Sequence, residues 1–100
     1  MCILYLTMQV KHEKDAQDGS FYLKDNGKNI GTLQYTLTGD NQMEIYHTEI
    51  DPDLRGKDLG IQLVEAAVKY AREESLKIIP SCTFAKAVFA RKQDFQDVLA

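Results

Sequence analysis

The chain has 100 residues with a formal net charge of −3, and 44% of them are hydrophobic and 27% charged, which is typical of a one-domain globular protein. An acidic balance argues against nucleic acid as a partner, because phosphate binding requires a basic surface. No apolar run reaches the roughly 20 residues of a membrane span, and the first ten residues lack a basic lead and a cleavage site, so we expect a cytoplasmic protein without a membrane partner.

The first ten residues predict a strand, because apolar and other residues alternate along 2–10. Residues 11–20 are polar and end near Gly19, so we expect a loop or a short irregular turn there.

Three further strands are predicted before the first helix. A short strand at 20–25 leads into the pair Asn26-Gly27, which is a strong signal for a tight hairpin. Apolar residues alternate again along 33–37, and a turn leads into a strand at about 42–50. We expect the four strands to be antiparallel.

The period of the apolar residues changes after Pro52, and a wide helical stripe begins. Its members are Leu59, Gly60, Leu63, Val64, Ala66, Ala67, Tyr70 and Ala71. A short buried strand at 76–80 and a helix at 83–93, with Phe84, Ala87 and Val88 facing inwards, complete the chain. The predicted order is ββββαβα, an α+β domain that spans residues 1–100.

Cysteine and histidine are too sparse to indicate a metal site. Cys2 and Cys82 lie far apart, and His12 and His47 do not complete a cluster with them. We expect reduced thiols, no structural metal, and a core position for Cys2.

The segment "DPDLRGKDLG", residues 51–60, has the features of an anion-binding turn. A helix begins here, and its unpaired N–H groups and positive dipole end attract anions. Arg55 and Lys57 add charge, while Gly56 and Gly60 allow close approach to the backbone. The alternative for this segment alone is a glycine-containing turn with exposed basic residues.

The four strands, this segment, and the stretches "HTEIDP", "AREESLKIIPSC" and "FAKAVF" together resemble the GCN5-related N-acetyltransferase superfamily. The resemblance covers roughly 30–98 and points to a small single-domain branch of about one hundred residues. Residues 55–60, from Arg55 and Gly56 through Lys57, Asp58 and Leu59 to Gly60, match the family pattern Gln/Arg-x-x-Gly-x-Gly/Ala, which wraps the pyrophosphate of acetyl-CoA.

The resemblance implies a minimal acyl-CoA N-acyltransferase fold, a twisted mixed sheet with a V-shaped splay between the fourth and fifth strands. The pantetheine arm of acetyl-CoA would lie in the splay. Asp58 departs from the pattern, since the family has glycine there. An acidic residue in a first helical turn contributes about 0.3–1 kcal/mol, whereas next to a pyrophosphate it costs roughly 1 kcal/mol or more. We expect weakened CoA binding.

Candidate chemical groups lie on the predicted fourth strand. By the period of two, His47 and Glu49 share one face, opposite Tyr46, Thr48 and Ile50. The resemblance implies that backbone near Ile50 pairs with pantetheine and that Glu49 or His47, directly or through water, accepts the proton of an attacking amine. The alternatives are a structural histidine and a solvated carboxylate.

Cys82 falls between the last strand and the last helix, where the helix dipole would lower its thiol pKa. The resemblance places a cysteine at the mouth of the splay, as an acyl acceptor or a proton donor to the leaving thiolate. The alternative is a buried small hydrophobe. Many family members use a tyrosine on the last helix as the acid, and no tyrosine follows Tyr70 here, so water or Cys82 must do that work.

On the last helix, Phe84 is a candidate cofactor contact, although Phe84 and Phe89 are also expected in the core. Lys86 is a candidate for a CoA phosphate, with a solvated lysine as the alternative. We therefore expect an acetyl-CoA-dependent N-acetyltransferase acting on an unidentified amine, as a monomer or a weak homodimer. The alternative is a non-catalytic CoA-binding or protein-interaction module of the same fold.

Overall fold

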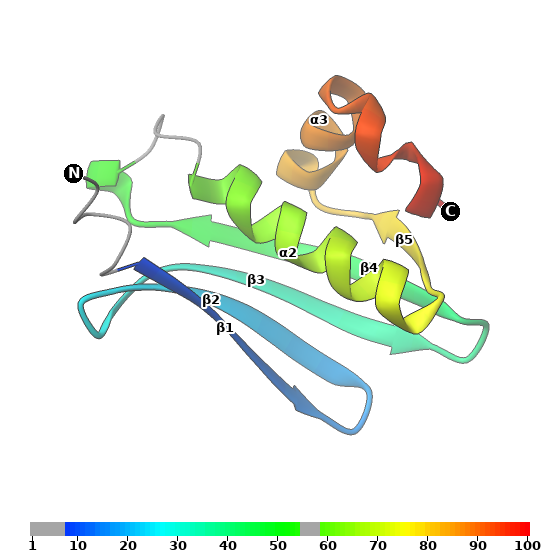
Figure 1. Cartoon of the computed structure of the whole chain (residues 1–100), viewed down its shortest axis with the longest axis horizontal. Helices are drawn as coiled ribbons and strands as arrows, with labels where there is room; N and C mark the ends of the chain where they lie inside the picture. Colours follow the sequence, from blue (N-terminus) through cyan, green and yellow to red (C-terminus); the bar gives the residue numbers. More distant parts are fainter. Residues whose placement is uncertain (1–7, 55–58) are drawn as a thin grey trace.

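The computed structural model describes residues 8–54 and 59–100, which form one five-stranded mixed sheet with helices (Figure 1). The strands follow the order β1-β2-β3-β4-β5, and β5 runs parallel to β4 while the other neighbours are antiparallel. Their bounds are Met8–Asp15 for β1, Asp18–Asp25 for β2, Lys28–Thr38 for β3, Gln42–Ile50 for β4 and Lys77–Pro80 for β5. The helices are η1 (Pro52–Leu54), α2 (Leu59–Glu74), α3 (Thr83–Arg91) and η2 (Gln93–Val98).

This arrangement confirms the predicted ββββαβα order and the mixed sheet. The turn at Asn26-Gly27 joins β2 to β3 as predicted, and positive φ values of 54° and 86° at the two residues are those of a type I′ turn. Among the described residues no helix is both long and apolar enough to cross a membrane.

The prediction of a loop at 11–20 is wrong. These residues form the end of β1, a two-residue turn at Ala16 and Gln17, and the start of β2. The polar composition misled the prediction because β1 is an edge strand, whose side chains are largely exposed on both faces. The predicted strand over 2–10 falls mostly on residues that the structure does not describe, as does Cys2.

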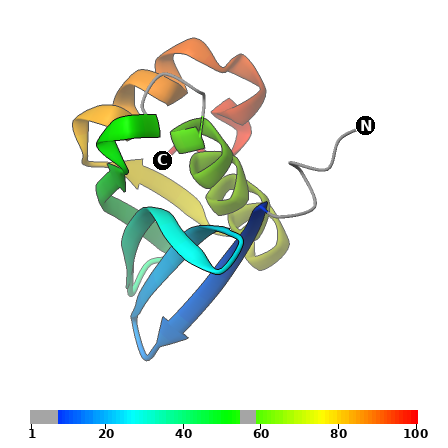
Figure 2. The same ribbon diagram turned by 90° about the vertical axis from the view of Figure 1, so that its left-hand side faces the viewer.

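The hydrophobic core lies between one face of the sheet and α2 (Figure 2). Leu33, Tyr35 and Ile45 from the strands and Leu63 and Val64 from α2 are all fully buried. Full burial of one such apolar side chain contributes about 1.5–3 kcal/mol. The helical stripe predicted for 59–71 is therefore the face that holds the helix on the sheet.

A β-bulge in β4 changes the alternation of its side chains. Gln34 pairs with His47 and Tyr35 with Ile45, so Tyr46 has no partner on β3. Tyr46 and His47 are consecutive and both exposed, while Ile45 is buried. The expectation that Tyr46 lies on the face opposite His47 is wrong, because the extra residue shifts the register by one.

The two parallel strands separate after four paired residues. The last pair is Ile45 with Pro80, and the N–H groups of Ser81 and Cys82 then both donate to the carbonyl of Ile45, at 3.0 and 3.1 Å. Pro80 contributes no N–H, so the ladder has no continuation on this strand. Beyond Ile45, β4 continues to Ile50 with β3 as its only partner strand in the described ranges. This confirms the predicted splay between the fourth and fifth strands.

The last helix presents a different face from the predicted one. Ala85, Val88 and Phe89 of α3 are buried, whereas Phe84 is 39% exposed and Ala87 is exposed. The expectation that Phe84 and Ala87 face inwards is therefore wrong, because the buried face of α3 lies one residue further along the chain. The prediction did not include η2, which closes the core with Phe95 and Val98. Asp97 connects η2 to α2, because its carboxylate accepts hydrogen bonds from the Arg72 guanidinium at 2.8 and 2.9 Å.

Candidate functional site

A cleft of about 620 Å³ opens where β4 runs on past the end of β5. Its walls come from the second half of β4, from η1, from the first turn of α2 and from α3. The lining residues are His47, Thr48, Glu49, Ile50, Leu54, Leu59, Gly60, Ile61, Phe84 and Arg91. Six of the predicted site residues therefore meet at one cleft, and Cys82 and Lys86 are not part of its lining.

Four predicted residues of the phosphate segment, Arg55, Gly56, Lys57 and Asp58, lie outside the described residues. The last two residues of that segment, Leu59 and Gly60, begin α2 and line the cleft. The cleft is thus bordered by a helix N-terminus, where backbone N–H groups have no partner within the helix.

The free edge of β4 forms one wall of the cleft. A strand presents hydrogen-bonding groups alternately to its two sides, so the stretch without β5 has groups available to an extended ligand. Ile50, half-buried, lies at the end of this edge, where a Cβ on Gly31 would come within 2.7 Å of the Ile50 Cδ1 atom. Glycine at this position of β3 therefore allows the isoleucine to lie against the sheet.

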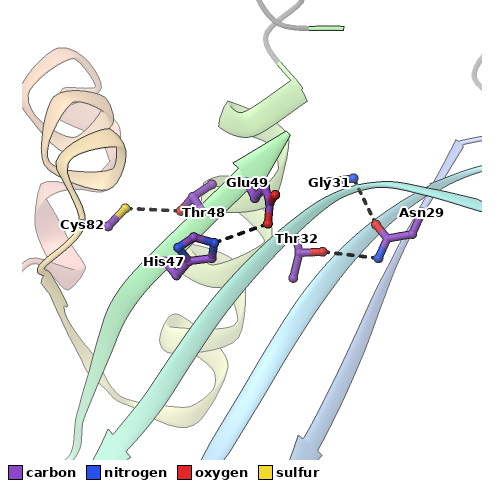
Figure 3. Close-up of polar contacts among 7 residues, drawn as sticks. All are labelled: Asn29, Gly31, Thr32, His47, Thr48, Glu49 and Cys82. Carbon is purple, nitrogen blue, oxygen red and sulfur yellow. Dashed lines mark hydrogen bonds and ion pairs between the residues drawn. The ribbon is translucent and has the colours of Figure 1, made fainter. Parts of the chain in front are cut away.

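His47 and Glu49 lie together on β4, as predicted from their spacing, with 3.5 Å between His47 Nε2 and Glu49 Oε1 (Figure 3). Both side chains are largely exposed. A contact of this length between exposed groups is weak, so each side chain can turn to meet a ligand. The arrangement offers two proton acceptors beside the cleft.

Cys82 is the N-cap of α3, and its sulfur accepts a hydrogen bond from the Ala85 N–H at 3.3 Å. The hydroxyl of Thr48, on β4, lies 3.3 Å from the same sulfur (Figure 3). The half-buried thiol therefore bridges the two arms of the splay. The sequence placed Cys82 between strand and helix, but Thr48 was missed, although a polar residue among the inward positions of β4 is a usable signal.

Two further polar groups of this region were also missed. The Ser81 hydroxyl donates to a carboxylate oxygen of Glu44 at 2.6 Å, which ties the end of β5 to the neighbouring strand. Arg91, in the last turn of α3, lines the cleft and gives it a positive charge. Ser81 and Glu44 are far apart in the sequence, and so are Arg91 and the residues of β4 that line the same cleft, so no local pattern indicated these positions.

Gly60 and Phe84 meet across the cleft between α2 and α3. A Cβ on Gly60 would lie 2.5 Å from the Phe84 Cζ atom, so the phenyl ring covers the first turn of α2 only because glycine stands there. Together with Leu54 and Ile61, the ring makes the floor of the cleft mainly apolar. No group of three or more His, Cys, Asp or Glu residues in the described ranges is placed to hold a metal ion.

Residues 20–98 match the model of a protein family described as GCN5-related N-acetyl-transferase. The protein named NATD1 from Danio rerio is 26% identical over 83 residues, which are 82% of this chain and 76% of the zebrafish protein. A GCN5-like candidate N-acetyltransferase from Staphylococcus aureus, with a structure solved by NMR, has a TM-score of 0.74 and 32% identity, covering 94% of this chain and 89% of that one.

A more distant structure that shares the fold contains coenzyme A. The PaiA N-acetyltransferase from Thermoplasma acidophilum, solved in complex with coenzyme A, has a TM-score of 0.57 and 17% identity. The match covers 60% of this chain and 37% of that one, and at this identity it concerns the fold alone.

Proposed function

The chain belongs to the GCN5-related N-acetyltransferase family, and we propose that it transfers an acetyl group from acetyl-CoA to an amine. The observation that carries the proposal is the cleft along the unpaired half of β4, bordered by the N-terminus of α2. An elongated ligand with amide groups, an apolar middle and an anionic end matches the free edge of β4, the apolar side chains of the cleft and the start of α2.

The walls of the cleft suit each part of such a ligand. The free edge of β4, up to Ile50, would pair with the amides of the pantetheine arm in the manner of an added strand. Leu54, Ile61 and Phe84 would cover its apolar parts.

The anionic end would meet the start of α2 at Leu59 and Gly60, because helix N-termini attract phosphate. Arg91 adds a positive charge to the same cleft. Arg55, Gly56, Lys57 and Asp58, and Lys86 on the exposed side of α3, remain candidate phosphate contacts of this proposal.

In the reaction, the amine nitrogen bonds to the thioester carbon while the bond from carbon to sulfur breaks. Glu49 or His47, directly or through water, would take the proton from the amine. Cys82 or water would return a proton to the departing thiolate, since the Cys82 sulfur lies 3.3 Å behind the hydroxyl of Thr48, which lines the cleft. A backbone N–H near Ile50 would stabilise the developing oxyanion.

A second candidate is a non-catalytic module that binds CoA weakly. Two features favour it: Asp58 replaces a family glycine in the phosphate segment, and no tyrosine follows Tyr70 to serve as the acid. Both candidates require CoA to bind, so binding is measured first and turnover second.

The binding test is an amide-resolved NMR titration with acetyl-CoA at fixed moderate salt, beside the Asp58→Gly variant. We expect shifts at Ile50, Leu59, Gly60 and Phe84, and tighter binding by the variant because a repulsive charge is removed. Control amides are those of the turn at Ala16 and Gln17, at the opposite end of the sheet from Ile50 (Figure 1). Absence of shifts in both proteins would contradict both candidates.

The turnover test follows the free thiol of CoA released when acetyl-CoA is mixed with a panel of amines. Release that depends on the amine, with the acetylated amine identified by mass, supports the transferase. Binding without release for any amine would leave the non-catalytic module as the better description. Intact-protein mass after acetyl-CoA alone would reveal acetylation of Cys82 if that thiol is an acyl acceptor.

A further inference from the structure

The strand β1 forms one edge of the sheet, remote from the splay (Figure 2). Among the described residues it pairs with β2 alone, so one side of its backbone faces outwards. Isolated edges of this kind attract other strands, and proteins commonly protect them with charged side chains. β1 carries such charged side chains, and their order along the strand also determines which other strand could pair with it.

The hairpin turn determines which backbone groups face outwards. The loop of Ala16 and Gln17 has two residues, so Asp15 and Asp18 form the hydrogen-bonded pair that closes the hairpin. Counting back by two from Asp15 shows that Glu13 and Lys11 also direct their N–H and C=O groups towards β2. The residues that alternate with them direct these groups away from β2. Those residues are Val10, His12 and Lys14.

We propose that β1 pairs with β1 of a second copy of this chain, antiparallel and about a twofold axis at His12. Val10 then exchanges hydrogen bonds with the partner's Lys14, and His12 with the partner's His12. Lys11 lies opposite the partner's Glu13, in the pair type whose side chains approach most closely. By symmetry, this attractive charge pair forms twice.

The other possible registers place like charges together. The twofold axis must pass through a residue and its own copy, because only then do the outward-facing backbone groups of the two strands lie opposite each other. An axis between two residues would place outward-facing groups opposite groups that already bond to β2. An axis at Lys11, Glu13 or Lys14 sets that charged residue directly opposite its own copy. Within the described residues, an axis at Val10 engages a shorter part of β1. The register at His12 alone combines opposite charges with a long overlap.

The side chains on the two faces of β1 agree with this partner. Lys11 and Glu13 are exposed on the outer face, with no ion pair to each other or to other described residues. On the inner face Val10 is 41% exposed, an apolar side chain that a neighbouring strand would partly cover. The same charges that deter an unrelated strand therefore complement a second copy of this one.

The test is sedimentation equilibrium at low salt over a wide range of protein concentration, on the wild type and on single charge reversals. Wild type is expected to approach twice the monomer mass of 11.4 kDa, less so at high salt because screening weakens the charge pairs. Lys11→Glu and Glu13→Lys are each expected to weaken self-association by roughly tenfold or more, since two attractions become two repulsions.

A mixture of the two single variants gives the most specific test of the register. One variant then carries two acidic side chains and the other two basic ones, so the mixed pair regains both attractions, and K11E with E13K should associate at least as well as wild type. The double reversal in one chain should self-associate too. Lys69→Glu and Glu65→Lys, exposed on α2, make the same changes of net charge away from β1 and should associate as wild type does.

Wild-type protein that stays monomeric up to about 1 mM, the weakest affinity that would matter, overturns the proposal. So does equal association of both single variants and wild type, or a mixture no better than its components. Amide NMR spectra confirm that each variant folds. On dilution of the wild type, these spectra should change along residues 9–15, and changes confined to other segments would assign the contact elsewhere.

Discussion

Gly19 and Tyr35 are cross-strand neighbours in which the tyrosine ring fills the space of the missing side chain. A Cβ on Gly19 would overlap the Tyr35 Cζ and Oη atoms, and Tyr35 itself is fully buried. The buried phenol reaches the edge of the sheet only because β2 has a glycine there. The tyrosine hydroxyl then lies 2.5 Å from His12 Nε2 on β1.

Gly19→Ala is expected to destabilise the protein by about 1–3 kcal/mol, because the added methyl group displaces a ring that has no free volume to enter. Urea unfolding measures the change. Gly39→Ala is the matched control, since nothing lies within 4 Å of a Cβ built there, and its effect should stay within about 0.5 kcal/mol. Equal stability of both variants would show that the ring has room to move.

The stability is expected to depend on pH through His12. Partial burial against neighbouring rings, and then the charge of Lys14, lower the pKa of His12 below its ordinary value of 6.5. Burial, and then Tyr70, raise the pKa of Tyr35, which stays neutral in this range. The unfolded chain therefore binds more protons in mild acid, and the free energy of unfolding falls as pH drops from above 6.5 through the lowered pKa.

Urea unfolding of wild type and His12→Gln between pH 8 and 5 measures this effect. The variant should lose part of the decline, whereas His47→Gln, which removes an exposed histidine, should keep it. The carboxylates contribute equally to all three proteins, so the difference between the variants isolates His12. Parallel curves for wild type and His12→Gln would contradict the assignment.

Gly60→Ala is expected to separate binding from stability. Alanine is the better helix former by roughly 0.5–1 kcal/mol, and the ring that must move is the exposed end of Phe84, so stability should change by less than about 1 kcal/mol. The displaced ring enters the cleft, and acetyl-CoA binding should weaken by about tenfold. Calorimetric titration measures the affinity.

The double variant Gly60→Ala with Phe84→Ala provides the control for that result. Removing the ring relieves the overlap, so the alanine at position 60 should cost less affinity in the Phe84→Ala background than in the wild type. Equal losses in the two backgrounds would show that the alanine acts on the helix start itself.

Glu49→Gln is expected to reduce kcat/KM by about 10²- to 10⁴-fold if Glu49 is the proton acceptor, with acetyl-CoA affinity nearly unchanged. His47→Gln is the paired variant, because the two side chains are in contact and either can take the role. A large loss in one variant identifies the acceptor. Full activity in the double variant Glu49→Gln with His47→Gln would exclude this pair and leave water as the acceptor.

Local signals predicted the order of the elements well. The Asn26-Gly27 turn, the stripe beginning at Leu59 and the strand that ends at Pro80 depend on backbone preferences and periodicity within a few residues. The hairpin of β1 and β2 was missed because an edge strand has no apolar face to reveal it. The bulge at Tyr46 was missed because it is defined only by the pairing with β3.

The candidate site divides in the same way. Its residue types, and the pairing of His47 with Glu49, followed from the sequence, because spacing along one strand determines which side chains share a face. Contacts between Thr48 and Cys82, and between Gly60 and Phe84, join elements that are far apart in the chain. The sequence alone determined most of the elements and the motifs that indicate the family, since these depend on patterns within short stretches of the chain. Only the tertiary structure decided the shape of the cleft. A shift of one residue in the buried face of α3, and the one extra residue in β4, each change the direction in which the side chains point.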